Sequence, residues 1–253
     1  MVKKRLVFLL MCLFSMAILN AQELAKHDIS ADVAAQGLFG YNNTYKWFAG
    51  TDLKGVMHVD NTDFSLNFEV LTENVYSVGY GVSPSFRVFD DGYVFFDGTL
   101  HSRILGKYKV YEFVYAGSVG FKMNHFTLQA GIFSRNIDVF GKDRHSFDSR
   151  VTEPFNFLYK LKISIMGLDN PWDIYMIGTN FNDFEYERMW SPLFTLGGRW
   201  DFKDRWSAVA EGTLKPVGMF HGTVRFYEAV LRVGVSFRLE TVGMAKSPKN
   251  KEI

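Results

Sequence analysis

The stretch from Tyr227 to Glu240, YEAVLRVGVSFRLE, decides the fold because its apolar and polar residues alternate almost without interruption. Every odd-numbered residue in it is apolar or aromatic, whereas the even-numbered ones include Glu228, Arg232 and Arg238. Such alternation predicts a β-strand with two unlike faces. At about 3.3 Å of rise per residue, the stretch is long for a soluble strand and fits a tilted membrane crossing. We expect one face in hydrocarbon and the other in water.

The same alternation recurs along the chain, with no convincing helix and no linker between the stretches. Because apolar and polar residues cancel in the average, the mean hydropathy of −0.04 resembles that of a soluble protein. We expect twelve strands, with ten or fourteen as alternatives because the first strand and the turn at 72–75 are weakly marked. The expected strands are 29–36, 47–59, 64–70, 76–88, 94–103, 112–122, 126–135, 155–165, 172–179, 194–202, 206–215 and 227–240.

The first 21 residues have the pattern of an export signal. A basic start at Lys3–Arg5 is followed by an apolar run from Leu6 to Leu19, and small Ala21 precedes the expected cleavage. The run is too short for a membrane anchor, and no later window holds the ~18 apolar residues that a spanning helix needs. We therefore expect a signal peptide at 1–21, a barrel at 22–240 and a short polar C-terminal tail at 241–253.

The only cysteine, Cys12, lies inside this leader. The mature chain is therefore expected to hold no disulfide and no thiolate site. A lipoprotein signal is disfavoured because Leu10 and Met11, and not small residues, precede Cys12. Without the leader's basic residues, 25 basic residues face 27 acidic ones, which argues against a nucleic-acid partner.

The connections between the expected strands alternate in length. The odd-numbered ones include three long ones, Gly40–Lys46, Asp138–Glu153 and Asn182–Ser191. The even-numbered ones are short turns rich in Asp, Asn and Gly, such as Asp60–Asp63 and Asp90–Gly92. Up-and-down outer-membrane barrels have short periplasmic turns and longer outer loops, so this pattern favours that class.

Taken together, the leader, the alternating strands, the connection lengths and an aromatic residue near the end of the closing strand make the chain resemble bacterial outer-membrane β-barrels of the single-chain, porin-like type. The resemblance covers nearly the whole mature chain. It implies an all-β, transmembrane, up-and-down antiparallel β-barrel of about 12 strands in the cell outer membrane of a Gram-negative-type envelope. It also implies contact with outer-membrane lipid, and assembly by the barrel-assembly machinery with Phe237 in the assembly signal.

Strand parity places most charged side chains in the lumen, with both signs in similar number. They could line a transport path, or they could form a structural ion-pair network that braces the interior. Lys160, Lys162 and Arg199 could form a basic wall that favours anions, or nearby acids could neutralise them. The residues we expect to line the lumen and set selectivity are Arg87, Asp97, Arg103, Glu112, Lys160, Lys162, Arg199, Glu211, Glu228 and Arg232.

Aromatic residues near the expected strand ends predict girdles at the two membrane interfaces, where an amphipathic ring suits the headgroup region. A ligand-stacking role is the alternative. The acidic and aromatic connection 182–190 could bind a partner or a cation, but we expect a solvated outer loop folded over the mouth. The expected girdle residues are Trp47, Tyr76, Tyr111, Trp172, Trp200 and Trp206.

These features favour a passive channel for small polar solutes. A non-conducting barrel that is structural or binds a surface partner is the alternative. A lipid-modifying enzyme is less favoured because His101 and Ser102 are adjacent on a strand and so point to opposite faces. The remaining histidines have no spacing that suits a metal, and we expect neither a metal nor another cofactor. The sequence does not specify the solute or the oligomeric state.

Overall fold

The computed structural model describes residues 29–42, 46–72, 74–89, 92–106, 109–140, 147–166, 170–183, 185–187, 189, 191–216 and 228–240. The expected signal peptide, the C-terminal tail, Tyr227 and Trp190 lie outside these ranges. Within them, no helix has the length and apolar character needed to cross a membrane.

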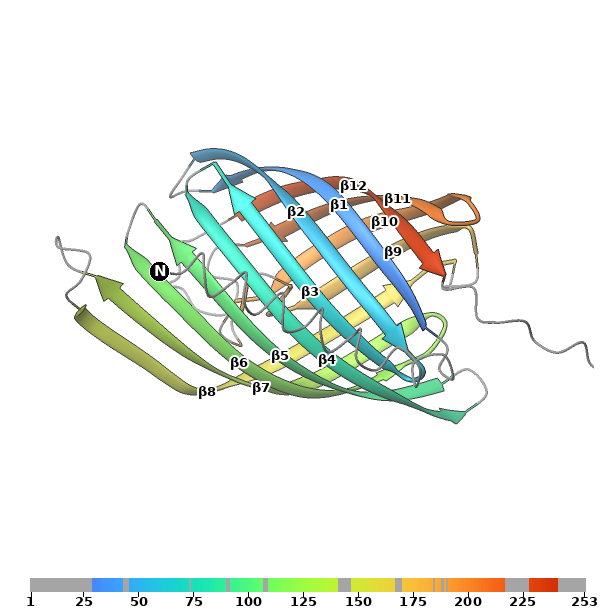
Figure 1. Ribbon diagram of the computed structural model, residues 1–253, viewed down its shortest axis with the longest axis horizontal. Helices are drawn as coiled ribbons and strands as arrows, with labels where there is room; N and C mark the ends of the chain where they lie inside the picture. Colours follow the sequence, from blue (N-terminus) through green and yellow to red (C-terminus); the bar gives the residue numbers. More distant parts are fainter. Residues whose placement is uncertain are drawn as a thin grey trace, which may run out of the picture.

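Twelve antiparallel strands form one closed barrel in which each strand pairs with its neighbours in sequence and β12 pairs with β1 (Figure 1). The closing pair is continuous, from Ser30 opposite Glu240 to Asn42 opposite Glu228. The expected up-and-down barrel of twelve strands is therefore confirmed. The strands are β1 (Ile29–Asn42), β2 (Lys46–Val59), β3 (Thr62–Leu71), β4 (Val75–Phe89), β5 (Gly92–Leu105), β6 (Val110–Lys122), β7 (Phe126–Phe140), β8 (Phe147–Ser164), β9 (Trp172–Thr179), β10 (Leu193–Lys203), β11 (Trp206–Lys215) and β12 (Glu228–Glu240).

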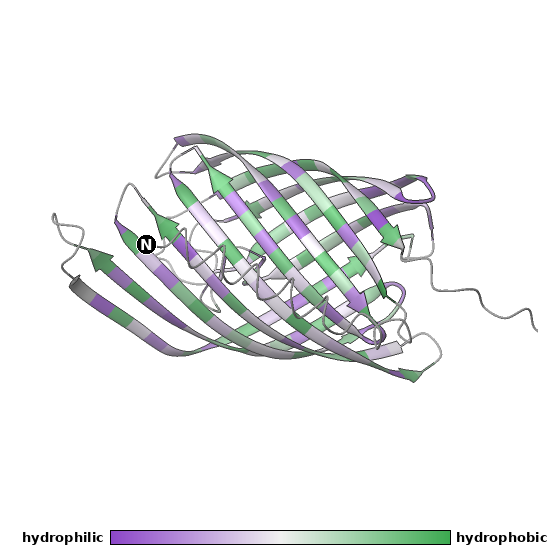
Figure 2. Ribbon diagram, viewed as in Figure 1, coloured by the Kyte–Doolittle hydropathy of each residue, from purple (hydrophilic) through white to green (hydrophobic). Residues whose placement is uncertain are grey.

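Hydrophilic and hydrophobic residues alternate along the strands of the barrel (Figure 2). Because successive side chains of a strand point to opposite faces, this alternation gives the wall an outside and an inside. On β2, Leu53 is 52% exposed on the outside, whereas its neighbour Asp52 points inward and is fully buried. Every strand carries large apolar residues that are exposed in this way. Apolar surface of this extent would promote aggregation in water, and it suits contact with lipid. Closure of the sheet also pairs the backbone groups that hydrocarbon could not satisfy.

The two ends of the barrel differ. We call the end where β1 begins and β12 finishes the turn end, and the opposite end the loop end (Figure 1). Trp172 stacks on Trp200 near the turn end with ring centroids 4.8 Å apart, and Trp206 lies 4.7 Å from Phe237. Near the loop end, Trp47 stacks on Phe39, and Tyr76 and Tyr111 begin their strands nearby. The expected girdle residues thus lie at both strand ends, and their role at an interface stays a prediction.

The connection lengths differ from those expected. The polar stretch Asp138–Glu153 belongs mostly to a long hairpin, because β7 runs to Phe140 and β8 begins at Phe147. Arg150 on β8 donates to Asp138 on β7 at 2.6 Å, so polar cross-strand pairs replace apolar ones there. The outward positions Asn136 and Asp138 are polar there while the inward Ile137 and Val139 are apolar, so the pattern of apolar outward residues reverses, which explains the error. Gly40–Lys46 is likewise mostly strand, and the turn-end connection 165–171 is longer than the loop-end connection 43–45.

Candidate functional site in the barrel lumen

The connection between β9 and β10 folds into the barrel. We call its described residues, 180–183, 185–187, 189 and 191–192, the lumen segment. Its side chains Phe181 and Tyr186 are only 8% and 6% exposed, and their rings stack with centroids 6.0 Å apart. They pack with Phe133, Val114 and Leu158, which point inward from the wall. The expectation of a solvated loop over the mouth is therefore wrong.

The physical reason is an unfilled apolar patch on the inner wall. Phe133 and Leu158 have inward parity on β7 and β8, and each is only 1% exposed. Apolar groups in a polar lumen gain free energy when an apolar partner covers them. Phe181 and Tyr186 supply that cover from a connection that is otherwise acidic. The sequence did carry a signal for this packing, namely apolar residues with inward parity on β7 and β8 together with a connection rich in aromatic residues.

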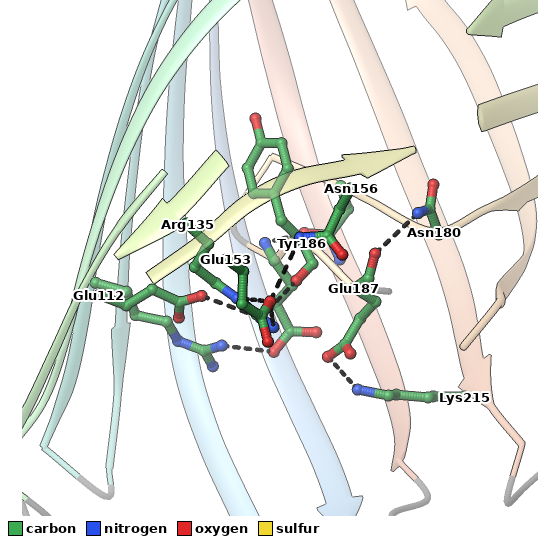
Figure 3. Close-up of polar contacts among 11 residues, drawn as sticks. Glu112, Arg135, Glu153, Asn156, Asn180, Tyr186, Glu187 and Lys215 are labelled. Atoms are coloured by element: carbon green, nitrogen blue, oxygen red, sulfur yellow. Dashed lines mark hydrogen bonds and ion pairs between the residues drawn. The ribbon is translucent and has the colours of Figure 1, made fainter. Parts of the chain in front are cut away.

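Asn180 starts the lumen segment by capping an exposed strand edge. β9 pairs with β8 only from Lys160 to Ser164, so the β8 backbone before this point lacks a neighbour on that side. The Asn180 side chain accepts a hydrogen bond from Tyr159 N at 2.9 Å and donates to Phe157 O at 2.7 Å. It also donates to Glu187 O at 2.8 Å, which ties the two limbs of the segment together (Figure 3).

Four strands spaced evenly around the barrel hold the lumen segment. On β2, Lys54 lies 2.6 Å from Asp183, and on β5, Arg103 lies 3.0 Å from Glu185. On β11, Lys215 pairs with Glu187 (Figure 3). The fourth anchor is the bonding of Asn180 to β8. β2 and β8 are opposite each other in the ring, as are β5 and β11, so the segment crosses the lumen.

Arg135 on β7 joins the lumen segment to two further acids (Figure 3). Its guanidinium donates to Glu153 at 2.6 and 3.0 Å, to Glu112 at 3.3 Å and to the backbone oxygen of Tyr186 at 3.0 Å. The hydroxyls of Tyr186 and Thr99 share a hydrogen bond of 2.8 Å. The backbone oxygen and the side-chain hydroxyl of Tyr186 are therefore both hydrogen bonded to the wall.

A second buried network lies on β2, β3 and β12. Arg232 donates to Asp52 at 2.9 Å and to Glu69 at 3.5 Å. Ser77 on β4 also donates to Glu69, at 3.4 Å. These groups are buried in the wall of the lumen, so their mutual pairing offsets the cost of removing them from bulk water.

The remaining expected lumen residues do not join these networks through the contacts seen here. Glu228 accepts from Asn42 at 3.1 Å, Asp97 accepts from Gln129 at 3.1 Å, and Arg199 lies 3.2 Å from Asp201. Arg87 has inward parity but lies at the turn end, where it donates to the backbone oxygen of Phe89. Parity assigns these residues only to a face of the wall, whereas the contacts that group them come from the structure.

Lys160 and Lys162 differ from the other inward cations. Among the described residues, no carboxylate lies within ion-pair distance of either ammonium group. Lys160 Nζ lies 5.8 Å from the ring centroid of Phe181, and Lys162 Nζ lies 4.0 Å from that of Tyr175. The Tyr175 ring covers Gly197, where a side chain would collide with it, and its hydroxyl donates to Glu211 at 2.6 Å.

A polar cavity of about 240 Å³ separates these lysines from the lumen segment. At ~30 Å³ for each molecule, it has room for about eight waters. Threonine hydroxyls and both signs of charge line it. The lining residues are Lys54, Lys160, Lys162, Tyr175, Ile177, Thr179, Phe181, Asn182, Asp183, Thr195, Glu211, Thr213 and Arg232.

The histidines in the described ranges lie apart from serine hydroxyls. His58 contacts Asp63 at 2.6 Å and Asp32 at 3.1 Å near the turn end, and the partner of His125 is the backbone oxygen of Ser164. His101 is buried beside the Tyr186 ring. No group of three metal-binding side chains is close enough to hold an ion in the described part of the chain.

No family model and no curated protein matches the sequence. Among solved structures, the chain is similar to the translocator domain of the autotransporter NalP from Neisseria meningitidis, with 15% identity, a TM-score of 0.49 and coverage of 89% of this chain and 96% of that one. It is also similar to the NanC porin, with 14% identity, a TM-score of 0.47 and coverage of 81% of this chain and 98% of that one. A third similar structure is the KdgM porin in complex with disordered oligogalacturonate, with 10% identity, a TM-score of 0.48 and the same two coverages. These structures are outer-membrane β-barrels, and the likeness concerns the fold alone.

Proposed function

We propose that the protein is an outer-membrane channel through which small polar solutes diffuse passively. The observation that carries this proposal is the polar cavity between the lumen segment and the wall. The segment narrows the lumen, and beside it remain Lys160 and Lys162, which have no ion-pair partner in the part of the chain that the structure describes. A solute would exchange its hydration for contacts with the charged and hydroxyl groups along this path.

The proposal includes the route to the membrane. The leader at 1–21 would direct export and be cleaved. The apolar exterior would then contact outer-membrane lipid, and Phe237 at the end of β12 would serve the barrel-assembly machinery.

A non-conducting barrel is the second candidate, and the anchoring of the lumen segment favours it. Wall strands on opposite sides of the barrel hold that segment, and ion pairs to Asp183, Glu185 and Glu187 brace its middle. A lumen held in this way could serve stability alone. A lipid-modifying enzyme would need a serine, a histidine and an acid in contact, and the histidine contacts described above offer no such arrangement.

Electrical recording in planar lipid bilayers separates the two leading candidates. A channel gives discrete conductance steps whose size depends on the salt concentration. Strand content by circular dichroism verifies that the reconstituted barrel is folded. A folded barrel that inserts and stays silent at all voltages would refute the channel proposal and leave the structural candidate.

A further inference from the structure

The two lysines of β8 have uncharged neighbours on both sides. Lys160 lies opposite Gln129 on β7 and Thr179 on β9, and Lys162 lies opposite Thr127 and Ile177. Side chains directly across a sheet are the nearest neighbours available for neutralisation. The wall therefore supplies no acid at the positions where one would cancel these charges most directly.

Three other inward cations have an acid directly across the sheet. Arg232 has Glu211 as its cross-strand neighbour, Arg103 has Glu112, and Lys215 has Glu228. At the cavity itself, Lys54 pairs with Asp183 and Arg232 pairs with Asp52. The two acids of the cavity lining are also engaged, because Asp183 contacts Lys54 and Glu211 accepts from Tyr175.

The aromatic contacts position the two ammonium groups without using their donors. A ring face attracts a cation electrostatically but accepts no strong hydrogen bond from it. Lys162 lies close to such a face, at 4.0 Å from the Tyr175 centroid. Successive inward residues on a strand are roughly 7 Å apart, so one small solute can reach both lysines. The hydroxyls of Thr195 and Thr213 line the same cavity and share a hydrogen bond of 2.9 Å, which leaves one hydroxyl donor for a solute.

We propose that Lys160 and Lys162 form a binding site for a small solute that carries carboxylate groups. The site makes such solutes the preferred cargo, and this inference rests on the channel function proposed above. Binding itself requires only the folded barrel and the cavity, so it is measurable without conduction.

The test is calorimetric titration of the detergent-solubilised barrel with sodium succinate. Uncharged succinamide and inorganic phosphate serve as comparison ligands. The variants are Lys160→Gln, Lys162→Gln and, as the matched control, Lys122→Gln. Lys122 is also an inward lysine, but it ends β6 at the turn end and does not line the cavity. All three variants remove one positive charge from the lumen and keep a polar side chain of similar length.

We expect saturable succinate binding that each β8 variant weakens by about tenfold or more, since each removes a charge-assisted contact. Lys122→Gln should weaken binding less than either β8 variant does, because Lys122 does not line the cavity and can act on the solute only at a distance through its charge. Succinamide should not bind. Absence of saturable binding would overturn the site, as would an equal loss in all three variants. Phosphate binding at least as tight as that of succinate would overturn the carboxylate assignment.

Bilayer recording then separates this inference from the channel function. Under a potassium chloride gradient, the reversal potential should indicate anion preference, and the double variant Lys160→Gln/Lys162→Gln should reduce it. A barrel that binds succinate but shows no conductance refutes the channel and keeps the site. A barrel that conducts but does not bind succinate refutes the site and keeps the channel.

Discussion

Replacement of Arg103 by methionine tests whether one buried ion pair holds the lumen segment. The Arg103–Glu185 pair has an N–O distance of 3.0 Å, and the two side chains are only 15% and 14% exposed. Removal of one partner leaves a buried charge without compensation, which costs about 3–5 kcal/mol. The Lys54–Asp183 pair is shorter at 2.6 Å, but Asp183 is 48% exposed. Solvent screens such a pair, so it contributes only about 0–1 kcal/mol.

These free energies predict a large difference between two variants that each delete one cation. Because the lumen admits water to Glu185, we take the lower limit of about 3 kcal/mol for Arg103→Met. At about 1.4 kcal/mol for each factor of ten, the open fraction of the lumen segment should rise roughly 100-fold. Lys54→Met should raise the open fraction by about fivefold at most. The burial of each ion pair, and not its N–O distance, therefore decides which of the two variants opens the segment more.

A cysteine at Ala116 reports the opening. Ala116 points into the lumen and packs against the cluster that contains Phe181 and Tyr186. Cys12 is the only natural cysteine and belongs to the expected leader, so the mature variant would carry a single thiol. A water-soluble maleimide should label that thiol only when the segment leaves. When opening and closing are fast relative to labelling, the labelling rate follows the open fraction.

Two results would refute this reasoning. Equal acceleration by Arg103→Met and Lys54→Met would mean that burial does not rank the anchors. No acceleration by Arg103→Met would mean that the apolar cluster and Asn180 hold the segment without the ion pair. Unchanged strand content by circular dichroism shows in each case that the barrel itself stays folded.

Two further predictions concern the wall. Gly131→Ala should lower the free energy of unfolding by about 1–3 kcal/mol in denaturant titrations, because the new Cβ would lie 2.2 Å from the backbone oxygen of Gly117. As the control, Gly117→Ala adds a Cβ that meets nothing within 4 Å, so it should change the free energy of unfolding by no more than about 0.5 kcal/mol. Equal effects of the two substitutions would refute the steric argument. Phe237→Ala should reduce the amount of assembled barrel in the outer membrane of cells more than Trp206→Ala does, although both substitutions remove the same ring contact. Equal reductions would mean that Phe237 contributes to packing only.

The sequence predicted the barrel because one physical signal, the period of two, repeats on every strand. A one-residue shift would turn every side chain to the other face, so parity is strongly specified. Arg103 and Glu112 share this parity, and they are direct neighbours across β5 and β6. The same rule failed for the hairpin that contains Asp138 and Arg150, because its outward face is polar and the alternation is reversed there.

The lumen segment was not predicted because its position depends on the inner wall of the closed barrel. The wall residues that it contacts are far from the segment in sequence. Residues 182–190 have no period, and a polar connection satisfies its backbone equally well in water or in a polar lumen. The contacts that hold the segment in the lumen are the apolar packing of Phe181 in the cluster with Phe133 and the ion pairs of Glu185 and Glu187. All of these join residues that are far apart in the chain. Contacts of that kind follow from the closed barrel and cannot be derived from parity.

The lumen cations divide into two groups that perform different physical tasks. Arg103, Arg135 and Arg232 each contact a buried acid, as expected where an uncompensated charge would destabilise the fold. A barrel that needed only bracing would give Lys160 and Lys162 acids as well, or would replace them with uncharged residues. Their cross-strand neighbours are uncharged, and an open cavity lies beside them. A positive charge without a directly paired acid among the described residues acts on whatever enters the cavity, which is why we assign these lysines to solute recognition and the arginines to the architecture.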